Sequence, residues 1–535
     1  MLEVPQRVIR AFFGRYGSKT RPLQDTTFRE IRDDRDLLVM APTGSGKTEA
    51  VFVPVACRLL TESRQLEGEI GALVLSPTRA LAGDLHTRMA PIFESLGLRL
   101  DVATGDRNTR SRRVTSDVLI RTPEGLDSTL CRQPETLRAV RDVVIDEIHL
   151  FLSDPRGTQL VGLLRRLSRI APEHRRLAVS ATIPNPAQPE RIRLLRSEPV
   201  TVSVRDEGSI EFLPHRWRGK SAPDGADAFL SFLKDSRCRK MLGFVRSRAR
   251  GEEMVAALNR GYLRGRCRVH HAGTSVTLRR ETERFLRESP VGLVVATSTL
   301  EVGIDTGDVD TCILFDVPKN ASSLLQRAGR AGRRDGQRRV VYTAGLFDSA
   351  ADFAKMIGRA SSTSAPTRTH ERPWLSGCIQ QCTSYVVQLG EVGRAELTLF
   401  LNEAFGMPEQ TAERMLSFMI VEQVLCEHMN RVSPGPIARE LFDKRSLHLT
   451  FAGYGGDRIV DETTGRTLGQ AIAHPGDAFL LGGRGRRVTR VDPGSGVAVT
   501  APVDGGTASF APGGLSPFEK LAKRCAPRLG GRFQT

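Results

Sequence analysis

The sequence predicts an α/β protein with two parallel-sheet domains, a small helical module and a small β-rich domain. Short apolar, β-branched runs alternate with helical patterns in two successive series, which is typical of parallel sheets covered by helices. The tail instead contains short β-branched runs separated by turns rich in Gly, Pro and Asp. We therefore expect domains at residues 1–205, 206–360, 361–440 and 441–535.

The apolar runs of the two series are the predicted strands, and polar motifs follow several of them. Chemistry in an open parallel sheet lies at the carboxyl ends of the strands, so these motifs are the candidate functional segments. In the first series the predicted strands are Asp36–Ala41, Ala72–Ser76, Asp117–Ile120, Val140–Asp146 and Leu177–Ser180. In the second series they are Met241–Val245, Arg268–His271, Gly292–Thr297 and Asp310–Asp316.

Residues 41–48 read Ala-Pro-Thr-Gly-Ser-Gly-Lys-Thr between a predicted strand and a predicted helix. Glycines let backbone N–H groups surround phosphate oxygens, the lysine reaches the β- and γ-phosphates, and the last hydroxyl suits Mg²⁺. The strict phosphate-loop pattern begins with Gly, whereas Ala41 stands first here. The residues predicted to bind ATP through this loop are Thr43, Gly44, Ser45, Gly46, Lys47 and Thr48.

Two adjacent carboxylates, Asp146 and Glu147, end the apolar run Val143–Ile145. We expect Asp146 to hold Mg²⁺ together with Thr48, and Glu147 to orient or deprotonate the attacking water. A strand that ends in Asp-Glu is weak evidence alone and becomes strong evidence beside a phosphate loop. Lys47, Asp146 and Glu147 are therefore predicted catalytic residues of an ATPase.

The composition moderately favours a protein that binds nucleic acid, and a coding bias toward arginine is the alternative origin of its positive charge. The net charge of +17 favours polyanionic partners. We find neither a long uncharged apolar run nor a secretory signal, so we expect a cytoplasmic protein. The nine cysteines are scattered, and Cys378 and Cys382 lack the second pair that a zinc site requires.

The order of motifs in the first domain resembles that of a superfamily-2 helicase of the DEAD/DEAH-box type. The resemblance implies that Gln24 reads adenine and that Phe13, or Phe12, supplies a stacking ring. It further implies that loops at the strand ends contact the nucleic-acid backbone. A second group of residues would couple ATP hydrolysis to contact with the nucleic-acid strand. The implied nucleic-acid contacts are Pro77, Thr78, Arg79, Gly105, Thr122 and Pro123, and the implied coupling residues are His149, Ser180 and Thr182.

The second series resembles the second RecA-like lobe of these helicases and contains no phosphate loop of its own. The resemblance implies nucleic-acid contacts by Arg246 and Thr297, and nucleotide contacts by Gly303 and Asp305. In residues 326–333, Gln-Arg-Ala-Gly-Arg-Ala-Gly-Arg, it implies that Gln326 orders the attacking water while Arg330 and Arg333 approach the γ-phosphate. A metal site at His270-His271 is not expected, because adjacent strand residues point to opposite faces.

The tail resembles the Lhr-type (large helicase-related) branch, in which a helical, winged-helix-like module precedes a segment similar to Thr463–Arg466, Pro475–Asp477 and Gly482–Arg484. An aromatic often follows the last Gly-Arg in that branch, whereas Gly485 stands here. The long C-terminal extension of the larger Lhr proteins is not found in this sequence. We therefore expect a helicase or translocase with ATP and Mg²⁺ as cofactors.

The resemblance implies 3′→5′ movement on single strands, with DNA or RNA–DNA hybrids as the favoured substrates. Two alternatives stay open. One is a double-strand translocase or remodeller, and the other is a nucleic-acid-binding ATPase subunit of a multiprotein repair or defence system. Both would use the same ATP site, so the sequence alone does not separate them.

Overall fold

The computed structural model describes residues 4–14, 17–33, 35–42, 44–61, 69–103, 116–152, 154–181, 193–196, 199–204, 209–301, 309–334, 337–361, 373–449, 456–492, 494–506, 515–529 and 533–534. The contacts divide the chain into two compact units, each assembled from separate stretches of sequence. Unit 1 contains residues 1–205, 368–452 and 515–535, and unit 2 contains residues 206–367 and 453–514. The chain therefore passes between the units after residues 205, 367, 452 and 514.

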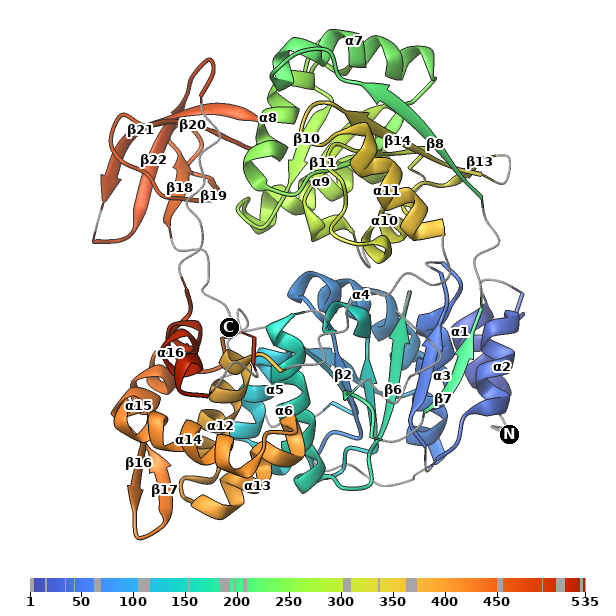
Figure 1. The fold of residues 1–535 in the computed structure, drawn as a ribbon. Helices are drawn as coiled ribbons and strands as arrows, with labels where there is room; N and C mark the ends of the chain where they lie inside the picture. The colour runs from blue at the N-terminus through green and yellow to red at the C-terminus, as the bar shows by residue number, and fades with distance from the viewer. Residues whose placement is uncertain are drawn as a thin grey trace. The chain divides into compact units, whose positions relative to one another are not determined.

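Unit 1 contains the first parallel sheet, as the sequence predicts (Figure 1). Its strands are β1 (Leu37–Met40), β2 (Ala72–Leu75), β3 (Leu100–Val102), β4 (Val118–Arg121), β5 (Asp142–Ile145), β6 (Arg175–Ser180) and β7 (Val200–Ser203). They lie in the order β3-β4-β2-β5-β6-β1-β7, and every pair is parallel. All carboxyl ends therefore meet at one edge of the sheet.

Helices cover both faces of this sheet because its strands are apolar on both sides. Leu37 and Val39 of β1 point into one core, and Leu38 and Met40 point into the other. The first core is closed by α1 (Gln6–Phe13), α2 (Pro22–Glu30), α3 (Lys47–Thr61) and α4 (Arg79–Ser95). The second is closed by α5 (Pro123–Arg132) and α6 (Pro155–Ile170).

The helical module of unit 1 packs against α5 and α6 through its first helix (Figure 1). Two helices followed by a β-hairpin give it the winged-helix-like form that the sequence predicts. Its elements are α12 (Leu375–Leu389), β15 (Val392–Gly393), α13 (Arg394–Phe405), α14 (Glu409–Val421), β16 (Leu425–His428), β17 (Arg431–Pro434), α15 (Pro436–Asp443) and α16 (Pro517–Cys525). Helix α12 is buried on every side from Leu375 to Val386, because lobe helices lie on one side and the rest of the module on the other.

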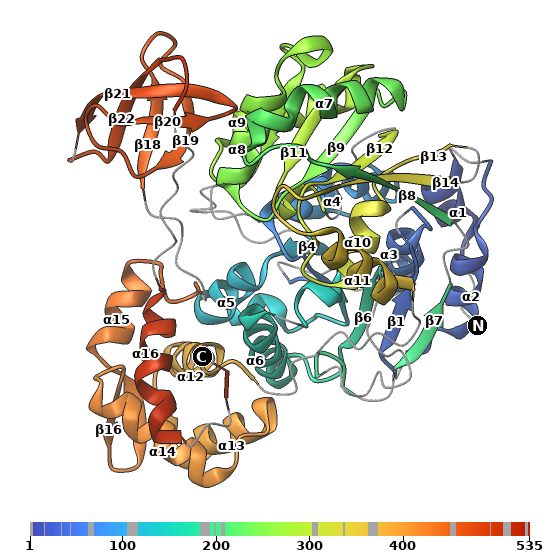
Figure 2. The ribbon, with the colours of Figure 1, turned by 45° about the horizontal axis from the view of Figure 1, so that its top comes forward.

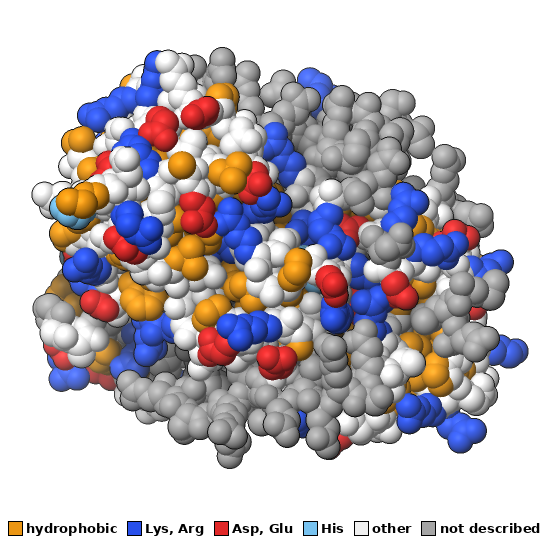
Figure 3. Space-filling view, turned by 90° about the horizontal axis from the view of Figure 1, so that it is seen from below, with side chains coloured by type: hydrophobic (Ala, Val, Ile, Leu, Met, Phe, Trp, Pro, Cys, Tyr) orange, Lys and Arg blue, Asp and Glu red, His pale blue; other side chains and the backbone are white. Residues whose placement is uncertain are grey.

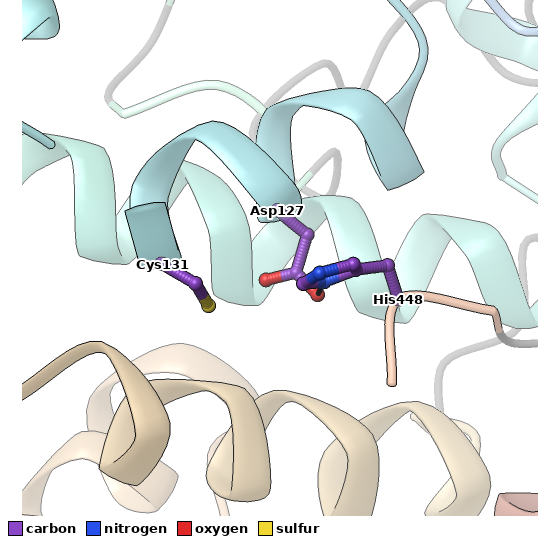
Figure 4. A group of neighbouring side chains, drawn as sticks. All are labelled: Asp127, Cys131 and His448. Atoms are coloured by element: carbon purple, nitrogen blue, oxygen red, sulfur yellow. Dashed lines mark hydrogen bonds and ion pairs between the residues drawn. The ribbon is translucent and has the colours of Figure 1, made fainter. Parts of the chain in front are cut away.

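A fully buried carboxylate, Asp127 of α5, joins the module to the first sheet domain (Figure 4). One oxygen of Asp127 forms an ion pair with the fully buried Arg166 of α6. The other oxygen accepts hydrogen bonds from Ser384 Oγ at 2.8 Å, Gln380 Nε2 at 2.8 Å and His448 Nδ1 at 2.9 Å. Burial raises the pKa of Asp127, but Arg166 and then His448 outweigh it and hold this pKa well below its usual range.

Unit 2 contains the second parallel sheet, whose central strands follow the sequence prediction. The strands are β8 (Ser209–Arg216), β9 (Lys240–Phe244), β10 (Cys267–His270), β11 (Gly292–Ala296), β12 (Thr311–Leu314), β13 (Arg333–Arg334) and β14 (Gln337–Ala344). Their order is β10-β11-β9-β12-β14-β13, and β8 pairs with β14. The helices are α7 (Ala222–Asp235), α8 (Arg248–Leu258), α9 (Val276–Glu288), α10 (Ala321–Ala328) and α11 (Ala350–Ser361).

A small, mostly antiparallel sheet forms the rest of unit 2 and lies beside α8 (Figure 2). Its strands are β18 (Asp457–Asp461), β19 (Thr467–Ala471), β20 (Ala478–Leu481), β21 (Arg484–Asp492) and β22 (Val497–Pro502), in the order β19-β18-β22-β21-β20. Its core is small, and Ile459, Phe479 and Val488 are among its buried members. A core of this size stabilises a sheet weakly, so its contacts with the lobe matter.

A second fully buried carboxylate, Glu252 of α8, joins this small sheet to its lobe. Glu252 Oε1 accepts from His271 Nε2 at 2.9 Å and from the backbone N–H of Gly482 at 2.8 Å. Its Oε2 accepts from the backbone N–H of Gly483. Backbone hydrogen bonds from Ser275 to Leu468 and from Gln470 to Gly273 add to this junction.

The last helix departs from the expected division of the tail. We assigned residues 441–535 to one β-rich domain, but α16 packs into the core of the helical module. Its apolar face is the reason, since Phe518, Leu521, Ala522 and Cys525 recur at helical spacing and are all buried there.

Among the described residues, no helix is both long enough and apolar enough to span a membrane.

We expect Asp127→Asn to lower the free energy of unfolding by about 3–5 kcal/mol at neutral pH, because it leaves the buried Arg166 without its counter-ion. Chemical denaturation measures this change. The pKa of Asp127 is lowered in the folded state, so its contribution is present above the unfolded pKa of about 4 and is lost as the pH falls further. Glu440→Gln, which removes an exposed ion pair with Lys444, should cost under about 1 kcal/mol. Equal losses of stability in the two variants would contradict the role of Asp127 as the buried counter-ion of Arg166.

We expect Glu252→Gln to loosen the small sheet, because a side-chain NH₂ then faces a backbone N–H and one donor stays unsatisfied. Limited proteolysis within residues 456–506 should accelerate by about tenfold. Glu253→Gln, one residue along α8, is the matched control because Glu253 is only partly buried. Cleavage of the Glu252→Gln variant at the wild-type rate would refute the anchoring role.

Candidate nucleotide and nucleic-acid site

The predicted phosphate loop lies between β1 and α3, at the carboxyl edge of the first sheet. Gly44 and Gly46 have φ values of 78° and 87°, in the left-handed region that favours glycine. The Lys47 side chain is buried, and its Nζ donates to the carbonyl of Ala41 at 2.6 Å. Ser45 Oγ donates to the carbonyl of Pro42 at 2.7 Å, so hydrogen bonds within the loop stabilise its conformation. Thr43 lies outside the described residues.

Gln24, the predicted adenine-reading residue, lies directly against this loop. Its Nε2 donates to the carbonyl of Gly46 at 3.2 Å, and its Oε1 accepts from the backbone N–H of Arg21 at 2.8 Å. A Cβ on Gly46 would stand 2.3 Å from Gln24 Nε2, and the φ of 87° at Gly46 also disfavours a larger residue there. Gln24 thus braces the loop, a contact that the sequence did not reveal.

The expectation of a stacking ring from Phe13 or Phe12 is not met in the structure. Phe13 is 2% exposed and Phe12 is 5% exposed, and both belong to the core between α1 and the sheet. The Phe12 ring packs edge-on against Phe93 of α4. The apolar face of α1 is used to close the core, so neither ring is accessible to a base.

The two carboxylates predicted to be catalytic lie at the end of β5, at the same edge as the phosphate loop. Burial and then the neighbouring Glu147 raise the pKa of Asp146 to about 7, and the nearby Lys47 acts in the opposite direction. Carboxylate and hydroxyl oxygens are the ligands that Mg²⁺ prefers, so Asp146 and Thr48 fit this ion. A carboxylate whose charge is poorly compensated is also a suitable partner for a cation.

Glu147 adopts an unusual backbone conformation, with φ 46° and ψ 50° in the left-handed region. This turn directs its buried side chain toward His149, whose Nδ1 lies 3.4 Å from Glu147 Oε2. His149 Nδ1 also lies 3.1 Å from Ser180 Oγ at the end of β6. The structure therefore brings together a carboxylate that is predicted to be catalytic and two predicted coupling residues. Thr182 lies outside the described residues.

Two of the predicted nucleic-acid motifs lie side by side at this edge, because β2 and β4 are neighbours in the sheet. Thr78 and Thr122 are both N-caps, accepting from the N–H of Leu81 at 3.2 Å and of Gly125 at 3.4 Å. Arg79 is exposed at the start of α4, whereas Pro77 and Pro123 are buried. Gly105 lies outside the described residues.

The predicted residues of unit 2 lie at the ends of its own strands. Arg246, after β9, is held by two carboxylates, with Nη2 at 2.6 Å from Asp348 Oδ1 and Nε at 3.5 Å from Asp316 Oδ1. Thr297, after β11, donates its backbone N–H to the carbonyl of His270. A nucleic-acid phosphate would therefore compete with two acids for Arg246.

The arginine motif of unit 2 begins in α10 and continues beyond its end. The Gln326 side chain is buried, and its Nε2 donates to Ser322 Oγ at 3.2 Å. Arg330 Nε donates to the carbonyl of Glu301 at 3.1 Å. Arg327 is a structural member, since it pairs with the Glu301 carboxylate at 3.1 Å and lies over the Phe244 ring. Of Arg333 the structure describes the backbone, in β13, and Gly303 and Asp305 lie outside the described residues.

Two histidine-containing clusters are structural and not metal centres. His270 and His271 point to different partners, Glu283 at 3.0 Å and Glu252 at 2.9 Å, as strand alternation predicts. Asp127, Cys131 and His448 lie close together, but both Asp127 oxygens are already bonded and Arg166 adds a positive charge (Figure 4). Burial raises the pKa of the Cys131 thiol to about 12, so a thiolate ligand is disfavoured.

Comparison with known proteins agrees with this geometry. The chain matches the family DEAD/DEAH box helicase over residues 21–189 and the helicase conserved C-terminal domain over residues 225–335. The ATP-dependent helicase Lhr-Core of Methanothermobacter thermautotrophicus is 31% identical over 348 residues, covering 58% of this chain and 40% of the relative. The Lhr helicase/probable uracil glycosylase of Mycolicibacterium smegmatis is 29% identical, covering 59% of this chain and 25% of the relative. The chain thus spans less than half the length of these relatives.

Solved structures share the fold over most of the chain. The Mycobacterium smegmatis helicase Lhr, bound to ssDNA and AMP-PNP, has a TM-score of 0.68 at 24% identity and covers 85% of this chain and 63% of its own. The DUF1998 helicase MrfA, bound to DNA and AMPPNP, has a TM-score of 0.74 at 23% identity and covers 94% and 73%. With both helicase domains matched and both RecA-like lobes present, the chain belongs to the DEAD/DEAH-box helicases of superfamily 2 and is similar to their Lhr-type branch.

Proposed function

We propose that the protein is an ATP-dependent nucleic-acid helicase or translocase that moves 3′→5′ along single strands, with DNA or RNA–DNA hybrids as substrates. One observation carries this proposal. The phosphate loop, the Asp146-Glu147 pair and the two backbone-contact motifs all lie at the carboxyl edge of one sheet. ATP chemistry and strand contact are thereby built on one rigid element, as a motor requires.

The residues of unit 1 bind ATP and prepare its hydrolysis. Lys47 would exchange its hydrogen bond with Ala41 for the β- and γ-phosphates, and the loop N–H groups would surround them. Asp146 and Thr48 would hold Mg²⁺, which neutralises phosphate charge when bound. Glu147 would orient or deprotonate the attacking water, because its buried Oε2 accepts no hydrogen bond among the described residues.

The residues of unit 2 would complete the site on the γ-phosphate. Arg330 and Arg333 would stabilise the charge that develops during transfer, a role that contributes about 10³–10⁵ in rate. Gly303 and Asp305 would contact the nucleotide, and Gln326 would help to order the water. These roles rest on the motif order that the chain shares with its family.

The His149 side chain would couple hydrolysis to strand contact. It lies between Glu147, which would face the reacting water, and Ser180 at the end of the neighbouring strand. A change at the γ-phosphate that moves Glu147 therefore reaches β6 through one side chain. The anchors Asp127 and Glu252 would make each accessory module follow its lobe when ATP binds and leaves.

The strand would be held mainly through its phosphates, because hydroxyl, arginine and loop N–H groups do not read bases. The net charge of +17 favours this binding and predicts a strong dependence on salt. Figure 3 shows basic and acidic side chains interspersed among the described residues of the face that it draws. We assign strand contact to the motif residues.

The proposal predicts ATP turnover that single-stranded nucleic acid stimulates and tailed duplexes that are separated. Lys47→Ala should abolish turnover, and Glu147→Gln should lower it by about 10²–10⁴ while ATP still binds. Turnover and strand displacement are measured together on tailed DNA–DNA, RNA–DNA and RNA–RNA duplexes. Glu135→Gln, an exposed residue of the same domain, is the control.

Two results would change the conclusion. Turnover that no nucleic acid stimulates would refute the motor. Stimulated turnover without strand displacement would instead support a double-strand translocase, or an ATPase subunit that needs its partners.

A further inference from the structure

An ion pair with two hydrogen bonds joins the first turns of α5 and α6. Arg156 Nε donates to Glu124 Oε1 at 2.9 Å, and Arg156 Nη2 donates to Glu124 Oε2 at 3.3 Å. The side chains are only partly exposed, 18% for Arg156 and 23% for Glu124. A planar guanidinium that binds both oxygens of a carboxylate fixes the orientation of its partner as well as its distance. The pair therefore holds the two helix starts in one relative geometry.

Glu124 belongs to the segment that is predicted to contact the nucleic-acid strand. Thr122 is the N-cap of α5, and Glu124 follows it by two positions in the first turn of this helix. A bound strand that displaces this turn would therefore also move the Glu124 carboxylate.

Arg156 belongs to the segment that follows the carboxylates predicted to be catalytic. It stands nine positions after Glu147, and Phe151 is the last residue of the short turn that begins at Glu147. Asp154 caps α6 by accepting from the backbone N–H of Arg156 at 2.8 Å. A Cβ on Gly157 would stand 1.9 Å from the carbonyl oxygen of Phe151. The start of α6 thus packs directly on the turn that follows Glu147.

The sheet does not join these two segments directly. In the order β4-β2-β5-β6, strand β2 lies between β4, which precedes α5, and β5, which precedes Glu147. The contact of His149 with Ser180 leads in the other direction, to β6. The Arg156–Glu124 pair therefore connects two segments whose strands lie two spacings apart, about 10 Å.

We propose that Arg156 is a positioning residue that couples strand contact to ATP hydrolysis through its ion pair with Glu124. The inference rests on the proposed function, since it names how the strand-contact segment would act on the water-orienting carboxylate. A strand bound at the first turn of α5 would shift Glu124, and Arg156 would move the start of α6 with it. The packing of α6 on the turn after Glu147 would then place Glu147 for hydrolysis.

A simpler role for the ion pair would be electrostatic. Glu124 lies beside the predicted phosphate contacts, so Arg156 would serve only to neutralise its charge. Loss of Arg156 would then weaken strand binding by repulsion between charges of the same sign, and turnover at saturating strand would stay unchanged. Coupling predicts the opposite, because it lowers turnover even when every protein molecule has bound the strand.

ATP turnover, measured over a series of concentrations of a single-stranded oligothymidylate, separates the two roles. Stimulation is the turnover at saturating strand divided by the turnover without strand. In Arg156→Gln we expect stimulation to fall by about fivefold or more, the lower end of energetic couplings between two sites. Glu124→Gln should show the same loss, and the double variant should lose no more than either single variant, because all three lack the same ion pair. Arg156→Lys keeps the charge without the paired donors, so it should keep only part of the stimulation.

Arg165→Gln is the matched control, because Arg165 lies on the same helix and its Nε donates to Glu403 of α13 at 3.1 Å. Its turnover should be stimulated like that of the wild type. If Arg156→Gln does not fold, Glu124→Gln gives the same test.

Four results would overturn the inference and leave the proposed function intact: wild-type stimulation in Arg156→Gln, an equal loss in Arg165→Gln, additive losses in the double variant, or a change confined to the half-saturating strand concentration. A wild-type protein whose turnover no strand stimulates would instead refute the proposed function itself.

Discussion

Two fully buried carboxylates determine how this chain is assembled. Asp127 binds Arg166 within the first lobe and three side chains of the helical module and its continuation, and Glu252 binds His271 and two backbone N–H groups of the small sheet. A buried carboxylate that loses one of its partners is strongly destabilised. Each module is therefore held in one position on its lobe. The sequence crosses between the units after residues 205, 367, 452 and 514, yet each unit keeps its own internal order.

The arrangement of the site residues within each unit suits the proposed motor function. Unit 1 carries the phosphate loop, the predicted catalytic carboxylates and two predicted strand-contact motifs at one edge of one sheet. The His149 side chain links Glu147 to Ser180 at that edge. Arg246, by contrast, is held by Asp316 and Asp348, so the strand contact that we propose for it would require an exchange of partners.

The sequence predicted what depends on local signals. Strands, the glycine loop and the carboxylates after β5 are short-range patterns, and the structure contains each of them. The partners of Asp127 and Glu252 were missed because His448 and Gly482 lie 321 and 230 residues away in sequence. The predicted stacking role of Phe13 was wrong because an apolar helix face can pack against a core as well as against a base, and the sequence does not distinguish the two. The helix α16 was misassigned for a similar reason, since composition does not show which core a terminal helix joins.

We propose that Arg330 of unit 2 stabilises the charge that develops during ATP hydrolysis, while residues of unit 1 bind the nucleotide. The most direct measurement compares ATP affinity with single-turnover hydrolysis in Arg330→Ala, in the presence of single-stranded nucleic acid. We predict nearly unchanged ATP affinity and a hydrolysis rate lower by about 10³ or more, because the arginine acts on the transition state and not on the bound nucleotide. Hydrolysis at the wild-type rate would contradict the account.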